Sequence, residues 1–189
     1  MAHGLRLAGA ALVAGLVAGA IAGAEARLAM WVLRLANPSH NGELTHANAE
    51  VGRVTAEGTV SLLIEGMFYG VGGAFVYLPV RRWMPGTGLA KGLAFGLYLL
   101  AVGAPAVLDG DYEYFRYAST WVGVAMFAAL YPLLGLVVSP LTEWLGRGQQ
   151  GRPRQPVAAW GGSIVLGVVG LVSLGRDIVM LRDVFHLFA

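Results

Sequence analysis

Residues 55–86 read TAEGTVSLLIEGMFYGVGGAFVYLPVRRWMPG, and this stretch decides the fold. Its apolar part, about Thr55 to Val80, is longer than the roughly 20 residues that an α-helix needs to cross a bilayer. It ends at Arg81-Arg82-Trp83-Met84-Pro85-Gly86, where basic and aromatic residues suit the headgroup region and Pro-Gly closes a turn. The stretch therefore predicts a transmembrane helix with one carboxylate, Glu65, inside it.

Four more apolar segments flank this helix. Of all residues, 57% are hydrophobic and only 13% are charged, against about 25% charged in soluble domains. We predict an all-α integral membrane bundle of about five transmembrane helices, forming a single domain over residues 1–189. A four-span version, with the last segment lying flat or the tail folded back, is the alternative. The flanking segments are Leu5–Ala36, Leu89–Leu108, Tyr117–Val138 and Val157–Leu174.

Two stretches near the C-terminus differ from the spans. Residues 146–156 are rich in Gly, Gln, Arg and Pro, which predicts a flexible linker on the cytoplasmic side. Residues 176–189 alternate charged residues with apolar ones at helical spacing. We expect this tail to be either an interfacial helix or an extension of the last span.

Charged residues are sorted across the predicted spans. Every acidic residue except Glu143 falls towards one side, whereas Arg81, Arg82 and Lys91 fall on the other. Because Lys and Arg are enriched in cytoplasmic loops, we expect a cytoplasmic N-terminus in a multi-pass protein of the bacterial inner (plasma) membrane. The alternative to a retained first helix is a signal peptide cleaved near Ala24, and we favour the retained helix.

Small residues recur every four positions along three segments. In a bilayer such stripes let helix backbones approach closely and gain dispersion contacts. We expect packing within the monomer, with self-association through the first stripe as the alternative. The stripes are Gly15-Gly19-Gly23, Gly66-Gly70-Ala74 and Gly88-Gly92-Gly96.

Glu65 is the residue that most suggests a function. A carboxylate within a bilayer is unfavourable unless it is protonated, paired or hydrated, so such a residue is expected to face the bundle interior or a wet cavity. With Glu57, Ser61 and Tyr69 it forms a stripe at four-residue spacing, which puts all four on one helix face.

Further ionisable residues are expected near Glu65. The first two segments are predicted to be antiparallel, so a structural ion pair from an arginine to Glu65 or Glu57 is the simpler interpretation. The sharper hypothesis is a pocket open to the outer leaflet. Its proton-handling candidates are Glu65, Glu57, Glu25 and Asp109, and its ligand-binding candidates are Arg27, Arg34, Tyr69, Asp111 and Tyr112.

The residue types in the chain argue against several classes of site. The chain has no cysteine, which excludes disulfides and thiolate metal sites. Glu43, His46 and Glu50 match only half of a di-iron carboxylate pattern, so we predict a polar loop and no metal. All histidines lie outside the predicted spans, which argues against haem, and the basic residues form no contiguous face for nucleic acid. We expect no cofactor.

The sequence resembles a family of small uncharacterised multi-pass membrane proteins of high-GC bacteria. The resemblance rests on Glu57-Gly58-Thr59, Tyr77, the run from Arg81 to Gly86, and Phe95-Gly96 with Pro105. It covers the second to fourth segments, implies a helical membrane fold and supplies no function.

The residues suggest a ligand-binding or assembly subunit with an outer-leaflet cluster of carboxylates and arginines. Its expected partners are the lipid bilayer, a lipophilic small molecule, and a second copy or a larger membrane complex. One alternative is a membrane-embedded acid–base enzyme, of isomerase, cyclase or epoxide-opening type, that uses Glu65 with a second carboxylate. Another is a proton- or cation-coupled permease, which we favour less because the spans lack an internal repeat.

Overall fold

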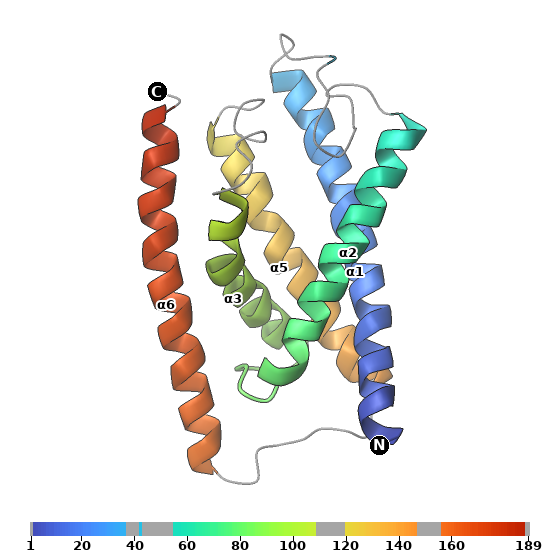
Figure 1. The fold of residues 1–189 in the computed structure, drawn as a ribbon, viewed down its shortest axis with the longest axis vertical. Coiled ribbons are helices and arrows are strands. Elements are labelled where there is room, and N and C mark those ends of the chain that lie inside the picture. Colours follow the sequence, from blue (N-terminus) through green and yellow to red (C-terminus); the bar gives the residue numbers. More distant parts are fainter. Residues whose placement is uncertain (1, 37–41, 43–54, 109–119, 147–155, 188–189) are drawn as a thin grey trace.

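The computed structural model describes residues 2–36, 42, 55–108, 120–146 and 156–187, and the regular structure within these ranges is entirely helical. The prediction of an all-α bundle is confirmed. Successive helices run in opposite directions, and the two chain termini lie at opposite ends of the bundle (Figure 1). The helices are α1 (Ala2–Ala36), α2 (Ala56–Val80), α3 (Gly88–Leu108), α5 (Thr120–Leu145) and α6 (Pro156–Leu187).

The bundle has two ends, each of which we name after one residue that lies there. The Arg81 end holds the start of α1, the turn between α2 and α3, and the end of α5 (Figure 1). There Leu7 of α1 reaches within 3.1 Å of the Cβ position of Gly146. The opposite end, where α2 begins, is the Glu57 end.

Helix α2 begins and ends where the sequence predicts. The Thr55 side chain caps it by accepting a hydrogen bond from the Gly58 amide at 3.2 Å, which satisfies one of the amides that a helix start leaves without a partner. In the turn after Val80, Gly86 and Gly88 have φ angles of 86° and 55°. Glycine adopts this region without a steric penalty, so the chain can reverse into α3.

Helix α5 extends beyond the predicted end at Val138 and continues to Leu145. The predicted end at Val138 is therefore wrong for the helix, which continues through Pro140. Ser139 and Thr142 are fully buried against neighbouring helices, and such contacts let a helix continue through a proline.

Helix α6 also exceeds its predicted end at Leu174. It continues without interruption to Leu187, so the described part of the tail extends the last helix. The expected linker at residues 146–156 lies outside the described residues except for its two ends.

Four described helices are long and apolar enough to cross a membrane: α1, α2, α5 and α6 contain the candidate spans. Helix α3 contributes a shorter apolar stretch, Gly88–Gly103. The four-span alternative had the last segment lying flat, whereas in the structure α6 is long enough to span and α3 carries the shortest apolar stretch.

Glycines bring two pairs of helices into backbone contact. A Cβ atom on Gly19 of α1 would collide with the backbone of Gly66 in α2, and a Cβ on Gly66 would collide with Gly19 in return. The first two predicted stripes therefore pack against one another within the chain. Because glycine has no side chain, the two backbones come close enough to gain dispersion contacts.

The third stripe is shorter than predicted. Gly92 and Gly96 of α3 pack on α5, where Gly135 supplies the matching surface. Gly88, the first residue of α3, has no atom within 4 Å of its Cβ position and is not part of the packed face.

Helix α6 lies at the edge of the bundle beside α3 (Figure 1). At the Arg81 end the indole of Trp83 rests on Gly162, whose missing Cβ leaves room for the ring. The Ser163 hydroxyl donates to the Trp83 carbonyl at 2.8 Å. The inner face of α6 then continues through Leu166, which packs on the core, and Gly170, which lies beside Tyr98 of α3.

Candidate functional site

The structure describes only some of the predicted site residues. The backbone of Arg34 lies in α1, but its side chain is outside the described part of the chain. Also outside it are Asp109, Asp111 and Tyr112, and the loop residues Glu43, His46 and Glu50.

The predicted face of α2 is open rather than packed. Glu57, Glu65 and Tyr69 are exposed, whereas Gly66 and Gly70 lie against α1. Glu65 forms no hydrogen bond or ion pair with a described residue, including Arg27. It therefore lies on an open surface of the bundle and not in its interior.

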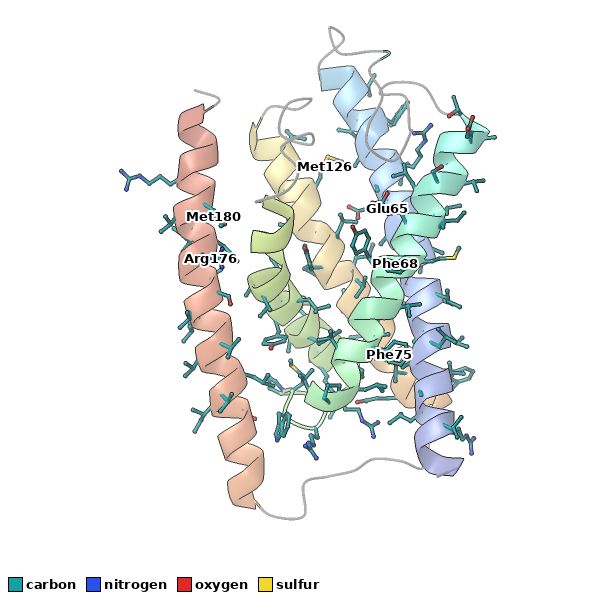
Figure 2. All side chains as sticks on the ribbon, viewed as in Figure 1. Glu65, Phe68, Phe75, Met126, Arg176 and Met180 are labelled. Carbon is teal, nitrogen blue, oxygen red and sulfur yellow. The ribbon has the colours of Figure 1, made fainter. Side chains whose placement is uncertain are left out.

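Glu65 lies in the Glu57 half of the bundle. Figure 2 shows it in the same half as Met126 of α5 and Arg176 of α6, whereas Phe75 lies towards the Arg81 end. Any pocket built around Glu65 therefore lies in the Glu57 half of the bundle.

Glu25 and Arg27 of α1 have different surroundings. Glu25 lies four residues before the buried Ala29 and seven after the buried Ala18, on a buried face of α1. Its Oε2 atom is buried without a hydrogen-bond partner among the described residues. Arg27 is only 7% exposed and interacts with other groups. Glu25 therefore has a buried oxygen without a partner among the described residues, whereas the Arg27 side chain interacts with other groups.

A hydrogen-bonded network joins α2, α3 and α5 at the Arg81 end. The Tyr77 hydroxyl donates to Glu143 Oε1 at 2.7 Å and lies 2.8 Å from the Ser139 hydroxyl. Since the phenol has one proton, Ser139 donates to Tyr77. Lys91 forms an ion pair with the same Glu143 oxygen, and the Tyr77 ring packs edge-on against Phe95 at 4.9 Å.

This network satisfies its own members, which marks it as a structural connection between helices. Sequence reasoning missed it, although one signal was present. Glu143 was the single acid on the basic side, and Lys91, the chain's only lysine, lies on that side too. An acidic residue and a lysine on the same side of the predicted membrane are expected to form an ion pair, because burying either charge alone is unfavourable.

A second polar cluster lies in the Glu57 half and joins α2, α5 and α6; we call it the Tyr131 cluster. Tyr131 of α5 lies within electrostatic range of the Tyr69 hydroxyl and of the Asp177 carboxylate. Asp177 is 4% exposed, and its Oδ1 atom has no hydrogen-bond partner among the described residues. Unlike the network at Tyr77, this cluster therefore contains a buried oxygen, Asp177 Oδ1, without a hydrogen-bond partner among the described residues.

Gly103 of α3 makes the Tyr131 cluster sterically feasible. A Cβ atom there would lie 3.0 Å from Cε1 and 3.3 Å from the hydroxyl oxygen of Tyr131. The tyrosine ring therefore packs on α3 where that helix has no side chain. The sequence carries no local signal of this contact, because the residues involved are distant along the chain.

An apolar layer separates the two polar groups. Tyr69 and Tyr77 are eight residues apart on α2, as are Tyr131 and Ser139 on α5, which is about 12 Å along each helix. Between them, Leu134 and Leu99 fill the space in front of Gly73. Leucine side chains therefore occupy part of the space between the Tyr131 cluster and the Arg81 end.

The described residues contain no group of three or more His, Asp or Glu side chains that could hold a metal ion. The chemistry that the Tyr131 cluster can offer is hydrogen bonding from two phenols and charge pairing by a carboxylate. Comparisons with protein-family models, curated proteins and solved structures found no match, so the sequence resemblance to high-GC bacterial membrane proteins stays an expectation.

Proposed function

We propose that this protein is a multi-pass protein of the bacterial inner membrane that binds the polar end of an amphipathic small molecule in the Tyr131 cluster. One observation carries the proposal: Asp177 is almost fully buried in an apolar helix, lies within electrostatic range of Tyr131, and has an oxygen without a hydrogen-bond partner among the described residues. Buried polar groups are normally satisfied, so an unsatisfied one next to other polar groups suggests a ligand.

The open face of α2 supports access from the bilayer. Tyr69 is 64% exposed and Phe68 is 78% exposed, and Glu65 lies one turn from Tyr69. A molecule with an apolar body could lie along this face with its polar end towards Tyr131, as expected of ligands that enter between helices.

The two rival functions have less support. An acid–base enzyme needs a second carboxylate that shares one open site with Glu65. Glu57 is eight residues away on the same helix, about 12 Å, and Asp177 is buried whereas Glu65 is exposed. Glu25 lies on a different helix, α1, and Asp109 lies outside the described residues. A permease needs a polar path through the bundle, and the leucine layer at Gly73 counts against one.

Native mass spectrometry of the full-length protein from its host membrane tests the proposal. We expect a bound molecule in the wild type and its loss in the double variant Tyr131→Phe/Asp177→Asn. Glu57→Gln is the matched control, because it also removes a carboxylate of the Glu57 half but lies outside the cluster. An absent adduct, or equal adducts in wild type and double variant, would overturn the proposal.

A further inference from the structure

Asp177 is turned towards the bundle by the register of α6. The inner face of this helix runs through Gly162, Leu166 and Gly170, each of which contacts α3, the Trp83 turn or the core. Asp177 follows Gly170 by seven residues, which returns it to the same face. Its neighbour Ile178 is 61% exposed, so the helix directs the carboxylate inward and its apolar side chains outward.

Among the residues that the structure describes, no buried cation lies against Asp177. Arg176 is the adjacent cation, but it is exposed, and consecutive helical residues point about 100° apart. On the bundle side both Asp177 and Tyr69 lie within electrostatic range of Tyr131. Phenol groups can accept a hydrogen bond from a cation and can present their ring faces to it.

The negative charge of the carboxylates around the cluster determines which headgroup charge is favoured. Glu65 adds a second carboxylate on the open side of the cluster, one turn from Tyr69, and forms no ion pair with a described residue. An anionic headgroup would meet two carboxylates in a medium where like charges repel strongly. A neutral headgroup would leave the Asp177 charge unmatched within an apolar helix, which is unfavourable.

We infer that the ligand is a lipophilic monocation, an apolar body with one ammonium group, and that Asp177 is its counter-ion with Tyr131 and Tyr69 beside it. This inference rests on the proposed function and adds the ligand's charge. The ammonium donates to the free Oδ1 of Asp177, and the apolar body lies against the open face of α2 near Phe68.

Three probes with one carbon skeleton and different charge test the inference on purified full-length protein in a nonionic detergent. They are 4-phenylbutylamine, 4-phenylbutanol and 4-phenylbutyrate, and binding is measured by isothermal titration calorimetry. We expect the amine to bind at least tenfold more tightly than the alcohol, and the carboxylate not to bind. Equal binding of amine and alcohol, or preference for the carboxylate, would overturn the inference.

Variants then test whether Asp177 is the counter-ion of the bound amine. Asp177→Asn should weaken amine binding at least tenfold and leave alcohol binding unchanged, whereas Glu57→Gln should change neither. Unchanged amine binding in a folded Asp177→Asn protein would overturn the assignment; if that variant does not fold, the wild-type probe series still decides the ligand's charge. A native adduct that needs Tyr131 and Asp177, together with no preference for the amine, would overturn only the charge and leave the proposed function standing.

Discussion

The hydroxyl of Tyr77 donates a hydrogen bond to Glu143 across the α2–α5 interface at 2.7 Å. The same carboxylate oxygen accepts from Lys91 of α3, so one acidic side chain connects three helices at the Arg81 end. Hydrogen bonds to charged groups contribute more than neutral ones, about 1.5–3 kcal/mol each.

The ion pair between Lys91 and Glu143 should stabilise the bundle. Lys91→Met leaves Glu143 without its cation, and Glu143→Gln leaves Lys91 without its anion. Since the two side chains are 14% and 23% exposed, solvent screening reduces the effect, and we expect each variant to lose about 1–2 kcal/mol.

A double-mutant cycle isolates this interaction. Reversible unfolding in mixed micelles of a mild detergent and dodecyl sulfate gives the free energy of each variant. The double variant should lose less free energy of unfolding than the sum of the two single variants. When both side chains are replaced, no unpaired charge remains. Additive losses would mean that the pair contributes nothing, and Glu57→Gln, an exposed carboxylate at the other end, should lie within about 0.5 kcal/mol of wild type.

Two buried hydroxyls on α5 should respond oppositely to removal. Thr142 is fully buried and its hydroxyl has no hydrogen-bond partner among the described residues, whereas Ser139 is bonded to Tyr77. Thr142→Val keeps the shape and removes an unsatisfied group, so it should be neutral or stabilising by up to about 1 kcal/mol. Ser139→Ala should lose about 1 kcal/mol in the same unfolding assay. A clear loss in Thr142→Val would show that its hydroxyl has a partner such as an ordered water.

Glycine substitutions on α2 should depend on the face they occupy. A Cβ on Gly66 would collide with the Gly19 backbone, whereas the Cβ position of Gly72 has no atom within 4 Å. Gly66→Ala should therefore force α1 and α2 apart and lose about 1–3 kcal/mol or more, and Gly72→Ala should be neutral or slightly stabilising. Thermal unfolding in detergent compares the two, and equal stability of both variants would contradict the observed α1–α2 contact.

Membrane topology can be tested cleanly because the chain has no cysteine. Thr87 in the α2–α3 turn and Glu57 at the start of α2 are both exposed. From the charge distribution we expect Thr87→Cys to react with an impermeant maleimide only from the cytoplasmic side, and Glu57→Cys only from the other side. Labelling of both positions from one compartment would refute a membrane-spanning α2 and the proposed orientation.

The amino-acid sequence by itself determined the helical elements and several of their ends. Helix α2 could be located because its length, the Thr55 cap and the Pro85-Gly86 turn are local features, and local features need no partner. The glycine spacing on α1 and α2 similarly indicated backbone-close packing. The end of α5 could not be located in this way, because the buried contacts of Ser139 and Thr142 beyond Val138 come from other helices.

Only the tertiary structure decided which helix faces meet. In a soluble helix the apolar stripe reveals the buried face, but along these helices both the packed face and the outward face are apolar, so helix rotation cannot be read from the pattern. The pairing of Lys91 with Glu143 and the approach of Tyr131 to Asp177 join residues far apart in sequence. They depend on how glycines such as Gly103 let the helices fit together, which is a property of the whole bundle.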